Sequence, residues 1–343
     1  MSSPTDPPRI GTLESGPRDS IGDLPGVTVG HCTLDAGPVQ TGVTVVRPHP
    51  EDLFLWKVPA AVAVLNGFGK SIGLVQVEEL GTLESPIALT HTFAAGTVAR
   101  AQIDHACRTA PAGRGPASFN PLVFECNDSC LNDLRAPRVG AEHFEAALAG
   151  AAAGFAQGSV GAGRGMAMFG LKGGIGSASR KAGGALVGAL VLANFGRSAD
   201  LILAGRRLGP VLAGRLREPA PSGESGSIII VLATDAVLGD RQLRRLALRA
   251  GAGLARTGSC FGHGSGDIVL AFSTAYRIPE DPEEDMPAPR ILHESLLDPL
   301  FRAAAEVTEQ AIVHALFRAT AVTGFGGHRR AGFLEVMPDW QAF

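Results

Sequence analysis

The chain has 343 residues and a formal net charge of −3, with 30 Lys and Arg against 33 Asp and Glu. Hydrophobic residues make up 45% and charged residues 18%, which excludes a disordered chain and indicates a globular protein with a large interior. The absence of a basic excess argues against a nucleic-acid partner. No run of about 18 uncharged apolar residues occurs, so we expect no membrane association.

The N-terminal segment and the cysteines bear on the compartment. Residues 1–20 contain four prolines and no apolar core, so we expect a flexible N-terminal tail and not a secretory signal. Five cysteines are too few, and odd in number, for a disulfide framework. These features favour a cytoplasmic protein.

Short apolar runs bounded by Gly, Pro or Asn recur along the chain and predict strands. These runs are residues 26–30, 42–47, 60–65, 86–91, 121–125, 166–171, 185–194, 227–233 and 267–273. Several are apolar on both faces, which requires covering layers on both sides of a sheet.

Helices are predicted between these strands. Asp240 can begin a helix with an apolar stripe from Leu243 to Leu254, and Asp298-Pro299 is a typical helix start. Residues 92–107 and 142–157 are predicted as two further helices. The pattern indicates a layered α/β protein with buried sheets.

A polar linker at residues 215–226 ends directly in the apolar strand that Ser227 begins. Cleavage of the Gly226–Ser227 bond would place an α-amine beside the Ser227 hydroxyl, and an amine with a pKa of about 8 can serve as the base for that nucleophile. The hydroxyl could itself attack the Gly226 carbonyl, because glycine leaves the approach open. The alternative is an ordinary flexible linker.

Three other places carry candidate functional side chains. Ser265 and Asp267 lie two residues apart on a Gly-rich turn, where they could orient a nucleophile or only satisfy the turn. Glu125 opens a cluster of acidic and amide side chains at 125–133, which could bind a substrate ammonium group or form Asx turns. Asn194 closes a buried apolar run, where its amide needs a partner and could stabilise an oxyanion.

Motifs for common cofactors are incomplete. Gly69-Lys70-Ser71 lacks the upstream glycine of a phosphate loop, because residue 64 is Val. Gly67, Gly69 and Gly73 do not have the dinucleotide-binding spacing. Cys126 and Cys130 have no second ligand pair at zinc spacing. We therefore expect neither a cofactor nor a metal.

Long sequence blocks in a fixed order carry a family resemblance. They are DLPGVTVGH at 23–31, TGVTVV at 41–46, KVPAAVAVLNGFGK at 57–70, VEELGTLESPIALT at 77–90, NDSCLND at 127–133, FGLKGGIGSASR at 169–180, GSIIIVLATDA at 226–236 and GHGSGDIVLAFSTA at 262–275. From about Ile21 to Thr323 the chain resembles the self-cleaving L-aminopeptidase/D-amidase-esterases and β-peptidyl aminopeptidases.

The resemblance implies a fold and a maturation step. The expected fold is a single four-layer αββα domain over residues 21–343, of the N-terminal-nucleophile-like type shared with ornithine acetyltransferases. Autoproteolysis would give an α chain of 1–226 and a β chain of 227–343, assembled as a homotetramer of such heterodimers.

It also implies site residues. Ser227 matches the nucleophile, Asn194 the oxyanion donor, and Ser265 with Asp267 the pair that orients the nucleophile and its amine. Glu125 falls where a carboxylate receives the substrate's amino group. Cys130 stands where an aromatic residue, commonly Tyr, is expected, and a thiol is a poor hydrogen-bond donor.

The expected activity is therefore that of a serine aminopeptidase or amidase that releases N-terminal L-, D- or β-amino acids from small peptides, amides or esters through an acyl-enzyme on Ser227. Two alternatives stay open. One is acyl transfer of the ornithine acetyltransferase kind, which Ser in place of Thr at the start of the β chain argues against. The other is a catalytically weak relative that acts as a binding or structural shell.

Overall fold

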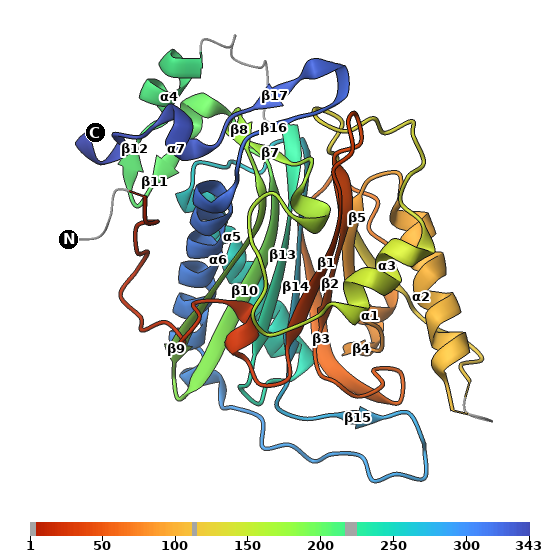
Figure 1. The fold of residues 1–343 in the computed structure, drawn as a ribbon. Helices are drawn as coiled ribbons and strands as arrows, with labels where there is room; N and C mark the ends of the chain where they lie inside the picture. The colour runs from red at the N-terminus through yellow and green to blue at the C-terminus, as the bar shows by residue number, and fades with distance from the viewer. Residues whose placement is uncertain (1–4, 112–114, 217–224) are drawn as a thin grey trace.

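The computed structural model describes residues 5–111, 115–216 and 225–343. Two β-sheets lie face to face, and helices cover the outer face of each (Figure 1). The layers follow the order helix, sheet, sheet, helix, which confirms the predicted αββα sandwich.

The smaller sheet has the strand order β1-β2-β5-β6. Its strands are β1 (Thr28–Leu34), β2 (Thr41–Arg47), β5 (Ile87–His91) and β6 (Leu122–Cys126). The first three pair antiparallel and β6 pairs parallel to β5. Helices α2 (Ala95–Thr109) and α3 (Ala141–Ala149) pack on its outer face.

The larger sheet has the strand order β15-β3-β14-β13-β10-β9, with β4 paired to β3. These strands are β3 (Trp56–Gly67), β4 (Thr82–Leu83), β9 (Gly174–Ala182), β10 (Ala185–Asn194), β13 (Ser225–Thr234), β14 (Gly264–Ser273) and β15 (Ile278–Pro279). The central pair β13 and β14 is parallel and the other pairs are antiparallel. Helices α5 (Asp240–Arg256) and α6 (Asp298–Arg318) cover its outer face.

Shorter elements frame the ends of the sheets. They are helices α1 (Leu74–Leu80), α4 (Gly209–Leu216) and α7 (Phe333–Val336), and the hairpins β7 (Ala167–Met168) with β8 (Leu171–Lys172), β11 (Ile202–Leu203) with β12 (Arg206–Arg207), and β16 (Val322–Thr323) with β17 (Arg329–Arg330). Figure 1 shows β7, β8, β16 and β17 gathered at one end of the two sheets. None of the helices within the described residues is long and apolar enough to cross a bilayer.

The side chains of β13 alternate between two buried faces, which explains why the strand is apolar from Ile228 to Ala233. Ile229 and Val231 face the core between the two sheets, whereas Ile228, Ile230 and Leu232 face the core under α5 and α6. Successive side chains of a strand point to opposite faces. Ser227 therefore points to the same side as Ile229, toward the smaller sheet.

Some predicted elements differ from the structure. The run 166–171 is not one strand but the hairpin of β7 and β8, because Phe169 and Gly170 adopt positive φ angles of 52° and 76° and turn the chain. The predicted helix 142–157 ends at Ala149. Strand β9, rich in Gly and Ser, lacked an apolar signal and was not predicted.

The N-terminal segment also differs from the prediction of a flexible tail, as residues 5–20 show. Ile10 is 4% exposed, its N–H donates to Gln310 Oε1 at 2.7 Å, and its carbonyl accepts from Arg180 Nη2 at 2.9 Å. These contacts attach the first described residues to β9 and α6, since a buried backbone must find hydrogen-bond partners. Of the predicted linker 215–226, residues 217–224 lie outside the described residues.

Candidate active site

The ends of three neighbouring strands bring the predicted site residues together. On β13, Ser227 is the register partner of Asn194 on β10 and of Gly266 on β14. Ser227 lines a cavity of about 390 Å³, whose walls also include Glu125, Asn127 and Cys130 from the smaller sheet and the loop that follows it. The cavity thus lies where the ends of the two sheets meet.

The Ser227 hydroxyl lies beside the peptide bond that precedes it. Its Oγ donates to the Gly226 carbonyl at 2.7 Å and accepts from the Gly266 N–H at 3.1 Å. Gly226 has a φ of +128°, and a Cβ there would come within 2.1 Å of the Asn194 carbonyl. Only glycine fits this backbone without strain, so the bond before Ser227 is held in a conformation that a larger residue would disturb.

Ser265 and Asp267 form a buried pair on β14. Both side chains are fully buried, and Ser265 Oγ donates to Asp267 Oδ1 at 2.5 Å. By register Ser265 lies beside Gly226 and Asp267 beside Ile228. The pair therefore flanks the residue before and the residue after Ser227, while the Ser265 hydroxyl donates to Asp267 and not to Ser227.

Asn194 uses both ends of its amide within the protein. Its Oδ1 accepts from the Ala167 N–H at 2.9 Å and its Nδ2 donates to the Asn127 carbonyl at 2.9 Å. An amide NH₂ has two N–H donors, so the bond to Asn127 engages one of them. These bonds fix the Asn194 side chain in the wall of the cavity, and the residue is 8% exposed.

Glu125 supplies a buried carboxylate at the end of β6. It is 4% exposed and its Oε1 accepts from the Lys70 N–H at 2.8 Å. A buried charge is costly unless it is paired, and this carboxylate lines the same cavity as Ser227. The site can therefore receive a cation in the same cavity as the Ser227 hydroxyl.

Two buried ionisable groups, Asp128 and Lys172, influence each other electrostatically beside the cavity. Burial raises the pKa of Asp128 to about 7, and its Oδ1 accepts from Asn132 Nδ2 at 3.1 Å. Burial also lowers the pKa of Lys172 well below its usual value. The Lys172 Nζ donates to three backbone carbonyls, those of Gly163, Met166 and Gly173, at 2.7–2.8 Å. Cys130 is half-buried on this loop and lines the cavity.

Sequence reasoning missed several contributors to this site. The Gly266 N–H could not be foreseen, because a backbone donor leaves no side-chain signal. Lys172, a lone charge in the Gly-rich apolar run 169–175, was a usable sign of a buried ion. Arg330, from the distant β17, also lines the cavity.

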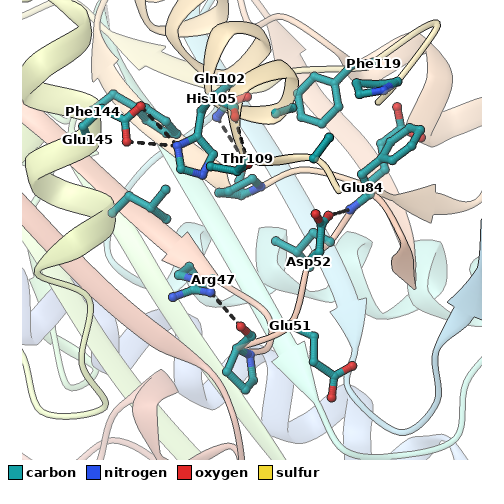
Figure 2. Close-up of a pocket in the computed structure, with 18 of the residues that line it drawn as sticks. Arg47, Glu51, Asp52, Glu84, Gln102, His105, Thr109, Phe119, Phe144 and Glu145 are labelled. Carbon is teal, nitrogen blue, oxygen red and sulfur yellow. Dashed lines mark hydrogen bonds and ion pairs between the residues drawn. The ribbon is translucent and has the colours of Figure 1, made fainter. Parts of the chain in front are cut away.

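A second cavity, also of about 390 Å³, lies beside α2, α3 and the segment that follows β2 (Figure 2). Its wall includes His105 of α2, Glu145 of α3 and Glu84. His105 Nδ1 lies 2.9 Å from Glu145 Oε2. Within the residues that the structure describes, no three His, Cys, Asp or Glu side chains gather in a group that could hold a metal ion.

The comparison with known proteins decides the family. The model of Peptidase family S58 matches residues 19–330. The chain belongs to this family. It is therefore a peptidase, as the resemblance of the sequence blocks predicted.

Individual relatives agree with this assignment. The chain is 37% identical over 336 residues to the β-peptidyl aminopeptidase BapA of Sphingosinicella xenopeptidilytica, covering 90% of this chain and 83% of that protein. Its fold matches the β-aminopeptidase of a Burkholderia species with a TM-score of 0.87, 40% identity and 96% coverage of both chains. The L-aminopeptidase D-Ala-esterase/amidase of Ochrobactrum anthropi, a variant of the Ntn hydrolase fold, matches with a TM-score of 0.86, 31% identity and 98% coverage of both chains. The peptidase described here therefore has the Ntn hydrolase fold.

Proposed function

We propose that this peptidase is a serine aminopeptidase that cleaves its own Gly226–Ser227 bond and then uses Ser227 as its nucleophile. The observation that carries the proposal is the position of the Ser227 hydroxyl, 2.7 Å from the Gly226 carbonyl oxygen and held by the Gly266 N–H. The aminopeptidases among its relatives support the same activity.

This geometry supports a self-cleavage step. Ser227 Oγ attacks the Gly226 carbonyl carbon, the C–N bond breaks, and the hydroxyl proton passes to the departing nitrogen. The resulting ester is hydrolysed by water, which leaves a carboxylate on Gly226 and a free α-amine on Ser227. Gly226 favours the step because it has no Cβ that would block the approach of the hydroxyl to its carbonyl carbon.

In the mature protein, the same hydroxyl would attack a substrate. The new α-amine, with a reference pKa of about 7.7–8.0, serves as the general base near neutral pH. Glu125 would bind the substrate's amino group, and Asn194 would donate to the developing oxyanion. Ser265 and Asp267 would hold the freed N-terminus in place. Water then releases the amino acid from the acyl-enzyme.

The substrates proposed are small peptides, amino-acid amides or esters with a free amine. Transfer of the acyl group to an added amine in preference to water would favour the acyltransferase alternative. Cleavage of the chain without turnover of any such substrate would favour the structural-shell alternative.

We further propose that mature chains form a homotetramer of αβ heterodimers in the cytoplasm. Val75 and Leu80 of α1 are 84% and 61% exposed, and exposed apolar side chains of this kind often mark interfaces. All five cysteines are free thiols, which suits a reducing compartment. Light scattering after size exclusion tests the tetramer, and cell fractionation tests the location.

The decisive experiment is a denaturing gel with intact masses. The wild-type chain should give two fragments that meet at Gly226–Ser227, and Ser227→Ala should remain one chain without activity.

Gly226→Ala should slow cleavage at least about tenfold, because its Cβ meets the Asn194 carbonyl. Gly154→Ala, where nothing lies within 4 Å of the added Cβ, is the matched control. A wild-type chain that is active while still intact would falsify the proposal.

A further inference from the structure

Lys172 is a buried cation that uses all its donors inside the protein. Its side chain is fully buried, and its Nζ donates to the carbonyls of Gly163, Met166 and Gly173 at 2.7–2.8 Å. An ammonium group has three N–H donors and a neutral amine has two, so this set of three acceptors fits the charged form. A buried charge is costly, yet none of the catalytic steps proposed above uses this one.

The Met166–Ala167 peptide group links Lys172 to Asn194. Its carbonyl oxygen, on Met166, accepts from Lys172 Nζ at 2.7 Å. Its N–H, on Ala167, donates to Asn194 Oδ1 at 2.9 Å. Two hydrogen bonds and one planar amide therefore connect the ammonium group to the side chain of Asn194.

The same link ends at the active-site cavity. Asn194 lines the cavity together with Ser227, its register partner on β13. Asn194 Nδ2 donates one N–H to the Asn127 carbonyl at 2.9 Å. The oxyanion role proposed for Asn194 uses the second N–H of this nitrogen.

A positive charge at the start of this link strengthens the bonds that follow. A cation on a carbonyl oxygen draws electrons from the amide nitrogen, which makes its N–H a stronger donor, and hydrogen bonds in a chain polarise one another by about 10–30% per bond. The Ala167 N–H acts in the same way on the amide of Asn194. It also fixes the orientation of that amide, because the oxygen and not the nitrogen must face an N–H.

Backbone bonds hold the β7–β8 hairpin that carries Lys172. The Phe169 N–H donates to the Phe195 carbonyl at 3.0 Å, directly after Asn194, and the Gly173 N–H donates to the Met166 carbonyl at 2.9 Å. Figure 1 shows β7 and β8 together at this end of the sheets. We therefore expect the hairpin to keep its place in variants of Lys172.

We propose that Lys172 is a positioning residue of the reaction, which orients and polarises Asn194 through the Met166–Ala167 peptide group. This inference rests on the proposed aminopeptidase function and deepens the role of Asn194 in it. The charge of the oxyanion develops only in the transition state, so the contribution of Lys172 falls on kcat and not on KM.

The first test is kinetic. Lys172→Met removes the charge, and turnover of the p-nitroanilides of α- and β-alanine is measured per cleaved chain, counted by intact mass. We expect kcat to fall roughly 10- to 100-fold with KM unchanged, a smaller loss than the roughly 100- to 1,000-fold of a deleted oxyanion donor. Lys172→Arg keeps the charge and should recover part of kcat. The matched control is Lys181→Met, because Lys181 is exposed on β9 and its Nζ lies 2.6 Å from Glu14 Oε1; its kinetics should stay those of the wild type.

A double-mutant cycle separates action through Asn194 from a general structural effect. In an Asn194→Ala background the link has no end point, so adding Lys172→Met should lower kcat less than about twofold. A loss of equal size in both backgrounds would make Lys172 merely structural and overturn the inference. A wild-type kcat in Lys172→Met or in Asn194→Ala would overturn it as well.

A spectroscopic test needs no variant of Lys172. The dipeptide Met-Ala occurs only at residues 166–167, so methionine labelled with ¹³C at the carbonyl and alanine labelled with ¹⁵N mark that single peptide group. In the mature wild type, NMR should show its carbonyl carbon and its N–H proton downfield of ordinary peptide groups, because a charge-assisted bond polarises both. Asn194→Ala should move the proton upfield. A carbonyl shift in the ordinary range would mean that no ammonium group acts on this carbonyl, which overturns the inference.

Failure of the inference and failure of the proposed function are distinguishable. A wild type that turns over the anilides with a kcat independent of Lys172 removes only the positioning role. A correctly cleaved wild type that turns over neither anilide removes the aminopeptidase proposal itself, and the inference with it.

Discussion

Two cavities of about 390 Å³ lie near opposite ends of β6, an outer one beside α2 and α3 and an inner one beside Ser227, yet their chemistry differs. In the outer cavity (Figure 2), three of the carboxylates, those of Glu51, Glu84 and Glu145, have basic side chains as partners. Glu145 contacts His105 at 2.9 Å and also Arg108, Glu84 lies 3.8 Å from Lys57 Nζ, and Glu51 lies 3.1 Å from Arg277. The inner cavity instead places a hydroxyl, a buried carboxylate and backbone donors around an open space.

The difference shows that volume alone does not identify a site. Paired charges stabilise one conformation and leave little capacity to bind a ligand. A buried carboxylate that has a single backbone N–H as its hydrogen-bond donor, as Glu125 has at Lys70, still gains from a cation. The inner cavity is the one in which substrate can complete interactions that the protein begins.

The largest expected effect is on substrates whose amine is blocked. N-acetylation removes the positive charge that Glu125 would receive, so turnover of a good substrate should be abolished. Glu125→Gln should raise KM by roughly 10- to 150-fold, the cost of a lost hydrogen bond to a charged group, and change kcat less. Steady-state kinetics on free and acetylated substrates checks both. Equal turnover of the two would place Glu125 outside the site.

The next effect concerns Asp128 and the stability of the inner region. Its pKa is about 7 in the folded protein and lies near 3.8 when unfolded, so the folded state retains a proton that the unfolded state loses. The contribution of Asp128 to the free energy of unfolding is therefore complete below pH ~4. As the pH rises toward 7, this contribution falls by about 4 kcal/mol in total. Asp128→Asn cannot titrate and should lack this loss.

Urea unfolding of the wild type and of Asp128→Asn from pH 4 to pH 8 measures this pH-dependent loss of stability. The difference in unfolding free energy between the wild type and Asp128→Asn cancels the titration of other groups that the substitution leaves unchanged. It should shift in favour of the variant as pH rises. A constant difference across this range would mean that Asp128 is already ionised in the folded protein.

Cys130 offers a gain of function at the inner cavity. Cys130→Tyr would add a hydroxyl donor toward the position of the oxyanion, and one such donor contributes about 2.7–4 kcal/mol to the transition state elsewhere. A contact made only in the transition state raises kcat and leaves KM unchanged. Kinetics and melting temperature are measured for Cys130→Tyr and Cys130→Ala. A destabilised Tyr variant would show instead that neighbours fill the space, and no change in either variant would place Cys130 outside the site.

The sequence predicted the layers, and it pointed to candidate site residues that the structure brings to one cavity, for identifiable physical reasons. Strand β10 was predicted with its exact bounds, 185–194, because its apolar run ends at an amide that must be satisfied. Ser227, Asn194 and Glu125 line one cavity, and each was a candidate because its polar side chain stands where a buried apolar run begins or ends. Each of these signals is local in the chain.

Features that depend on distant segments were not predictable in this way. Arg330 reaches the cavity only because the β16–β17 hairpin packs on the loop after β6, which no local pattern encodes. Residues 5–20 looked like a tail, since the partners of Ile10 are Arg180 and Gln310, far along the chain. The turn at Phe169 was missed because a positive φ at a bulky residue leaves no mark on hydrophobic periodicity.

The smallest expected effect tests the outer cavity with the same chemical change as the inner one. Glu145→Gln removes the carboxylate that His105 and Arg108 contact, but its side chain is 32% exposed. Partly exposed ion pairs contribute about 0–1 kcal/mol, so urea unfolding should show a loss within that range. kcat/KM should stay at the wild-type value, because Glu145 lines the outer cavity and not the cavity that Ser227 lines. If Glu145→Gln altered kcat/KM as Glu125→Gln does, the outer cavity would be coupled to catalysis, and the contrast between the paired and the open cavity would no longer separate structure from function.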